Sequence, residues 1–105
     1  MSTVVAPVEN LTALRVRVLA VGPHPRLAGW DLASVDVLSA APVAGRADLL
    51  SERAGGRVEL AVRRELLSGA GGGSVLALRA RLWMGEIMAE PHPLPQDFTI
   101  EPERP

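Results

Sequence analysis

The chain has 105 residues, 48% of them hydrophobic, a formal net charge of −1 and no cysteine. This length suffices for one domain with a modest core, and the composition is that of a globular protein. The lack of cysteine excludes disulfides and thiolate metal sites, and the near-neutral charge gives no overall attraction to nucleic acid or anionic lipid. No apolar run approaches the roughly 18 residues of a membrane span, so we expect a cytoplasmic protein with no membrane partner.

The chain begins with an N-terminal arm, residues 1–12, followed by the first predicted strand. Val4 and Val5 suit an edge strand or a docking segment within this arm. Residues 13–21 alternate between two faces, one of them fully apolar, and then meet the sequence Gly-Pro-His-Pro, which ends a strand. The arm therefore precedes a domain that we place at residues 13–90.

A second strand and a short helix are predicted next. Residues 30–40 carry apolar side chains at alternate positions, which indicates a strand. Residues 46–53 have leucines at helical spacing and a glycine that can cap the end, so they predict a helix of about two turns. Leu49 and Leu50 would close one end of a barrel or sandwich.

Residues 57–89 carry the strongest pattern. Two alternating runs flank the glycine-rich segment 68–74, which predicts a β-hairpin with an extended loop. Opposite charges favour a register that places Glu59 across from Arg81. Gly85 interrupts the second run and predicts a bend before a short strand. The inward set is Val58, Leu60, Val62, Leu76, Leu78, Ala80, Leu82 and Met84.

The last segment, residues 91–105, is rich in proline. Asp97–Glu101 is a compact strand signal within it, and Phe98 and Ile100 are its apolar residues. We expect this tail to dock on its own domain or on the sheet edge of a neighbour.

The sequence offers no chemical motif, so we assign no catalytic, cofactor-binding or metal-binding residue. His24 and His92 each lie between two prolines, but they lack the short spacing of a metal motif. The glycine run in 68–74 lacks the Lys-Ser/Thr of a phosphate-binding loop, and no serine has the setting of a nucleophile elbow.

These observations predict a small, partly open antiparallel barrel or sandwich of five or six strands, with one short helix between strands two and three. The function we expect is a non-catalytic protein-interaction or assembly module, either a homo-oligomer or an accessory subunit. The alternative is an OB-like binder of single-stranded nucleic acid. Either function would use one set of outward-facing arginine and tryptophan side chains. That interaction face consists of Arg15, Arg17, Arg79, Arg81 and Trp83.

Overall fold

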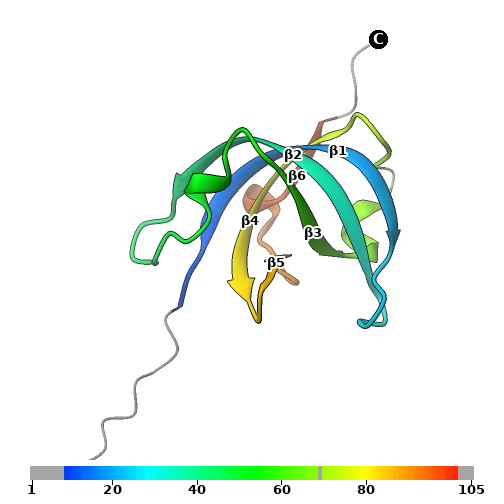
Figure 1. Cartoon of the computed structure of the whole chain (residues 1–105), viewed down its shortest axis with the longest axis horizontal. Helices are drawn as coiled ribbons and strands as arrows, with labels where there is room; N and C mark the ends of the chain where they lie inside the picture. The colour runs from blue at the N-terminus through cyan, green and yellow to red at the C-terminus, as the bar shows by residue number, and fades with distance from the viewer. Residues whose placement is uncertain (1–8, 69, 102–105) are drawn as a thin grey trace, which may run out of the picture.

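Six strands form one sheet in the computed structural model, which describes residues 9–68 and 70–101 (Figure 1). Five of them close into a barrel in the order β1-β2-β3-β5-β4-β1, and the sixth adds to the edge of β4. Every pairing is antiparallel except that of β3 with β5, which is parallel. The predicted all-β barrel is confirmed, and it is closed and mixed. The strands are β1 (Thr12–Pro23), β2 (Trp30–Pro42), β3 (Arg57–Arg63), β4 (Val75–Trp83), β5 (Glu86–Ala89) and β6 (Thr99–Glu101).

The core is built from the inward positions of the barrel strands. Alternation places their apolar side chains on the inner face, as the sequence predicts. Two leucines from the connections, Leu50 and Leu67, complete the cluster. The strand residues in it include Leu14, Val16, Val18, Val35, Val37, Leu60, Val62, Leu76, Leu78, Ala80, Ile87 and Ala89.

The helix predicted over residues 46–53 is reduced to a single 3-10 turn. Asp48 Oδ1 accepts hydrogen bonds from the backbone N–H groups of Leu50 (3.2 Å) and Ser51 (3.0 Å), and this local turn competes with a helix. Leu50 is fully buried, whereas Leu49 is 43% exposed and does not help to close the end of the barrel. The 3-10 turns of the described chain are η1 (Ser51–Arg53), η2 (Arg64–Leu67) and η3 (Pro95–Asp97).

The predicted hairpin over 57–89 is wrong in its pairing, because β3 and β4 are not neighbours. β3 lies between β2 and β5, and β4 lies between β1 on one edge and β5 and β6 on the other. Glu59 therefore faces Ser34 of β2 instead of Arg81, and the Ser34 hydroxyl donates to Glu59 Oε1 at 2.7 Å. Met84, predicted to point inward, is 85% exposed.

Candidate interaction site

The pairing of β1 with β4 places Arg15, Arg17 and Arg79 on neighbouring strands, and Arg81 and Trp83 follow on β4 just beyond the paired residues. Arg15 lies opposite Ala77, and Arg79 lies opposite Ala13, so the arginines of the two strands alternate along their shared outer surface. We call this surface the arginine face. Sequence reasoning found its residues but gave no sign that β1 and β4 are adjacent. The arginine face consists of Arg15, Arg17, Arg79, Arg81 and Trp83.

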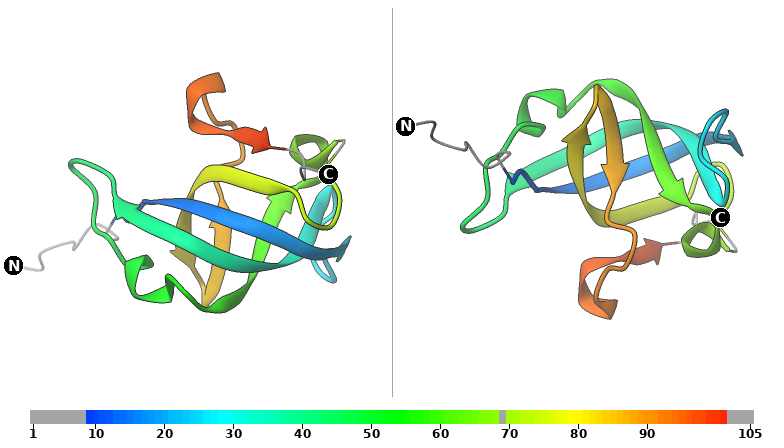
Figure 2. Two further views of the ribbon diagram at one scale, coloured as in Figure 1. Left: turned by 90° about the horizontal axis from the view of Figure 1, so that it is seen from above. Right: turned by 90° about the horizontal axis from the view of Figure 1, so that it is seen from below.

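The C-terminal segment lies against the arginine face. We call residues 95–101, which form η3 and β6, the strap; Figure 2 shows it standing out from the barrel beside β4. Val75, Leu76 and Ala77 of β4 pair with the three residues of β6. Phe98 and Ile100 are partly buried and pack against the core. These two predicted docking residues thus contact their own barrel, while Val4 and Val5 lie outside the described residues.

Three carboxylates of the C-terminal segment pair with two arginines of the face. Glu90 binds Arg79 in a bidentate manner, at 2.7 Å to Nε and 3.1 Å to an Nη atom. Asp97 lies 3.3 Å from the same guanidinium, and Glu101 lies 3.1 Å from that of Arg15. The hydrogen bond to Glu90, together with the negative charges of Glu90 and Asp97, raises the pKa of Arg79 against the effect of desolvation.

These ion pairs differ in strength because they differ in burial. The side chains of Arg79 and Glu90 are only 28% and 24% exposed, and a charge-assisted bidentate pair in that setting is a strong contact. Arg15 and Glu101 are 50% and 57% exposed, and an exposed pair of this kind contributes about 0–1 kcal/mol. The C-terminal segment is therefore held firmly at Glu90, just before the strap, and loosely at Glu101, the end of the strap.

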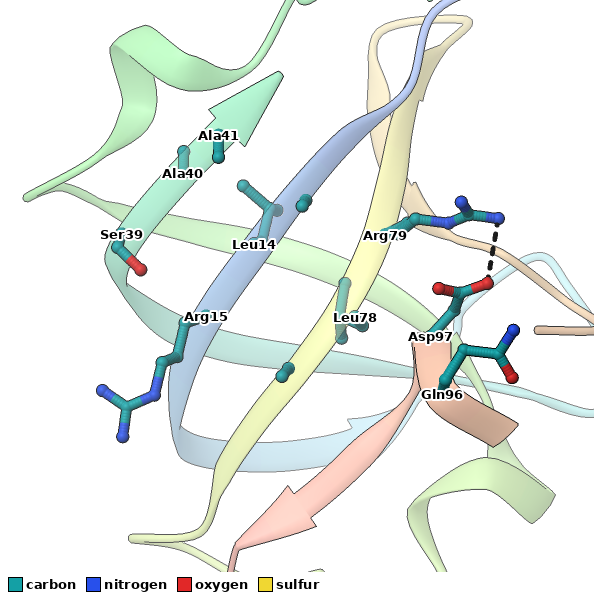
Figure 3. A pocket seen from close by; sticks show the side chains of 11 residues that line it. Leu14, Arg15, Ser39, Ala40, Ala41, Leu78, Arg79, Gln96 and Asp97 are labelled. Carbon is teal, nitrogen blue, oxygen red and sulfur yellow. Dashed lines mark ion pairs between the residues drawn. The ribbon is translucent and has the colours of Figure 1, made fainter. Parts of the chain in front are cut away.

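A shallow pocket of about 350 Å³ lies on the outside of β1, with η3 as one wall (Figure 3). Strands β1, β2 and β4 line it, in part with the small side chains of Ala13, Ser39, Ala41 and Ala77. Arg79 at its border points toward Asp97 of η3 (Figure 3). The small residues leave room beside the arginines for an extended chain or a planar group.

The other two arginines of the face have no ion pair among the described residues. Arg17 is exposed on β1, and its neighbour Asp36 on β2 pairs with Arg57 instead, at 3.2 Å. Arg81 Cζ lies 5.4 Å from the centre of the Trp83 ring, which is a cation–π contact. Arg17 and Arg81 are therefore the cations of this face that are open to a ligand.

The connection between β4 and β5 is a two-residue turn, Met84 and Gly85, which we call the hairpin tip. Met84 has φ of 51° and Gly85 has φ of 80°, and positive φ at both positions is what a type I′ turn requires. Glycine or asparagine is usual at the first position, because glycine has no Cβ to crowd the backbone and the short asparagine side chain can hydrogen-bond locally, whereas other side chains cost energy there. Met84 is nevertheless 85% exposed, and Trp83 beside it is 50% exposed. The tip thus displays apolar surface in a backbone conformation unfavourable to methionine.

Asn10 holds the β4 side of this tip. Its side-chain Nδ2 donates to the carbonyl of Leu82 at 3.1 Å, and its Oδ1 accepts from the Leu82 N–H at 2.7 Å. The amide side chain therefore pairs with β4 as a backbone peptide would, just beyond the last residues that β1 and β4 share.

His24 and Arg26, from the β1–β2 connection, hold the β5 side. The imidazole is fully buried, and its Nδ1 accepts hydrogen bonds from the N–H groups of Arg26 (3.1 Å) and Leu27 (3.0 Å). The ring hydrogen is therefore on Nε2, which donates to Glu86 Oε1 at 2.7 Å. The hydrogen bonds from His24 and from Arg26 lower the pKa of Glu86. β4 and β5 are thus each held by side-chain hydrogen bonds next to the hairpin tip.

The two histidines do not form a joint site. His24 is engaged by Glu86, whereas His92 Nε2 lies 3.3 Å from the guanidinium of Arg63. Within residues 9–68 and 70–101, no three histidine or acidic side chains are grouped so that they could hold a metal ion. The same residues contain no helix long and apolar enough to cross a membrane.

Comparison of the chain with protein-family models, with curated proteins and with solved structures finds no match in any of the three. The geometry of the arginine face and of the C-terminal segment that pairs with it is what bears on function. Sequence reasoning missed the acidic partners of the face. Their signal was present, since Glu90, Asp97 and Glu101 flank the apolar residues of the tail.

Proposed function

We propose that this barrel is a non-catalytic protein-interaction and assembly module, and that the arginine face binds an acidic, extended segment of polypeptide. One observation carries the proposal: the face already holds such a segment, its own strap. Asp97, Glu101 and the three-residue strand β6 make up that contact, and Glu90 just before the strap adds a third carboxylate. Strand addition of this kind takes affinity from backbone hydrogen bonds and specificity from side chains.

The chemistry of the face supports a carboxylate ligand. Arginine presents a planar fork of donors that matches a carboxylate, as in the bidentate contact of Arg79 with Glu90. Arg17 and Arg81 would serve a longer acidic segment, because neither has an ion pair in the described part of the chain. The exposed Arg81, Trp83 and Met84 belong to residue types that are enriched in protein interfaces.

The test uses the full chain and a fluorescent peptide with the sequence of residues 94–101. In a variant with Asp97→Asn and Glu101→Gln, the strap competes less, and the peptide should bind more tightly than it binds the wild-type chain. Adding Arg79→Ala should weaken binding about tenfold, since it removes the guanidinium that lies 3.3 Å from Asp97 in the resident strap. Arg57→Ala serves as the control, because that arginine lies on β3 and pairs with Asp36.

The readout is fluorescence anisotropy. The proposal is wrong if the peptide binds no better than one in which its two acidic residues are replaced by amides. It is also wrong if Arg57→Ala weakens binding as much as Arg79→Ala does.

Binding of single-stranded nucleic acid is a second candidate for the same face. It is supported by the closed five-stranded barrel, an architecture that includes the OB fold, and by Arg81 stacked beside an exposed tryptophan. A labelled oligothymidylate, titrated at low and moderate salt, tests it. Steep salt dependence and loss of binding in Arg79→Ala plus Arg81→Ala would favour nucleic acid over the acidic peptide.

A further inference from the structure

β5 and β6 occupy the same edge of β4 and run in the same direction. β1 covers the opposite edge from Val75 to Ala80, and both β5 and β6 are antiparallel to β4. Ala89 of β5 faces Ala80, and Thr99 of β6 faces Ala77. The two short strands therefore resemble one strand interrupted by an excursion of the chain over residues 90–98.

This excursion is much longer than the gap that it bridges. Three residue steps along β4, from Ala80 to Ala77, cover about 10 Å. The linker between Glu90 and the strap is residues 91–94, and the five residue steps from Glu90 to Pro95 reach about 17 Å when extended. Pro91, Pro93 and Pro95 favour an extended linker over a helix or a further strand. This extended linker can carry the strap away from its own β4 and onto that of a second barrel packed close beside it.

The strap itself is weakly retained. β6 is three residues long, and its ion pair to Arg15 is exposed. Its apolar residues, Phe98 and Ile100, are only partly buried. Glu90 is the strongest contact of the segment, but it precedes the linker, so it can stay on its own Arg79 when the strap leaves.

From this geometry we propose that two copies of the chain exchange their straps, each placing residues 95–101 on β4 of the other. Asp97 and Glu101 of one copy would then pair with Arg79 and Arg15 of its partner. The contacts of the exchanged strap are the same as those within one chain, which is why exchange is an accessible route to a dimer. The inference rests on the proposed function in one respect: the arginine face is the receiving surface.

Concentration decides between the closed and the exchanged forms. A strap on a short linker faces its own β4 at an effective concentration in the millimolar range. The closed monomer therefore dominates in dilute solution. The ratio of exchanged dimer to closed monomer should rise about twofold for each doubling of total protein while monomer predominates, as mass action requires.

The absence of cysteine from the chain permits a direct test. One full-length chain carries Ala77→Cys, and a second, with a tag that alters its size, carries Thr99→Cys. These positions are opposite each other in the β4–β6 pairing. The two chains are unfolded together, refolded at high concentration and oxidised. A disulfide between the tagged and untagged chains is expected, because exchange brings residue 77 of one chain against residue 99 of the other.

The matched control is a mixture of chains that carry Ala13→Cys or Ala41→Cys. These residues are also direct partners, but they lie in β1 and β2 within the barrel, where no strap takes part. Exchange predicts a mixed disulfide in clear excess of this control, and light scattering of the wild type should detect a dimer that disappears when residues 91–105 are removed. Equal yields in the two mixtures would overturn the inference.

The outcomes separate the two proposals. If the labelled strap peptide binds the arginine face but the mixed disulfide does not exceed the control, the proposed function stands and exchange is wrong. If the mixed disulfide forms but the acidic peptide binds no better than its amide version, exchange is correct and acidic recognition is wrong.

Discussion

Replacing Met84 with asparagine should stabilise the protein. Met84 has φ of 51° and is followed by Gly85 with φ of 80°, so the variant would carry Asn-Gly, the sequence that type I′ turns prefer. A residue with an ordinary side chain loses roughly 1–2 kcal/mol in the left-handed region, of which asparagine recovers a part. Since the methionine is 85% exposed, little apolar burial is lost. We expect a gain of about 1 kcal/mol, which corresponds to a rise in Tm of about 4–8 °C.

Thermal and urea denaturation followed by circular dichroism would measure this change without relying on the fluorescence of the adjacent Trp83. Met84→Ala is the matched control, because it removes the same exposed side chain but supplies no polar group that could hydrogen-bond locally in the left-handed backbone. Its stability should equal that of the wild type or fall slightly below it. If Met84→Asn is no more stable than Met84→Ala, the hairpin tip is not strained and the argument from its backbone is wrong.

Three further variants test other contacts. Asn10→Ala leaves the N–H and C=O groups of Leu82 without their side-chain partner and should cost about 1–3 kcal/mol in urea denaturation; a loss within error would show that water replaces the amide. Glu86 has a pKa lowered from 4.5 in the folded state, so the stability it contributes is present above that value and is lost as the pH falls through the lowered pKa. Melting curves from neutral to acid pH should therefore fall less steeply for Glu86→Gln than for the wild type, and equally steep curves would contradict this. Arg79→Ala should accelerate chymotryptic cleavage at Phe98 more than Arg15→Ala does, because the pair of Arg79 with Asp97 of the strap is more buried than the pair of Arg15 with Glu101. The opposite order would place the main anchor of the segment at Glu101.

The strands could be predicted because alternation is a local property. Residues 13–21 and 30–40 fall within β1 and β2, and the inward residues of the later strands, such as Leu60 and Leu78, are buried as expected. In an extended segment every second side chain points to the same face, so alternating apolar residues need only an apolar core beside them to form a strand. The sequence therefore determines which residues are strands and which face is inside.

Strand neighbours could not be predicted in the same way. The hairpin over 57–89 followed from proximity along the chain and from an opposite-charge register, but an exposed charge pair contributes too little to choose a partner. Instead, the connection from β3 to β4 buries Leu67 of η2 in the core. It then leads to the edge of β1 that does not pair with β2, where β4 is placed. Barrel closure decides the pairing, because it removes both edges of the sheet at once.

The arginine face depends on that closure, since its residues come from β1 and β4, which lie far apart in sequence. Three carboxylates of the C-terminal segment pair with Arg15 and Arg79, which leaves Arg17 and Arg81 without an ion pair among the described residues. A single-stranded polyanion that contacted only these two would bind with a logarithmic salt slope of about −1.4, whereas one that displaced the segment and contacted all four arginines would give about −3. On either functional proposal, the ligand would compete with the same resident segment. How firmly the strap is held decides what the face can bind, and exchange between two copies would keep the face covered while joining them.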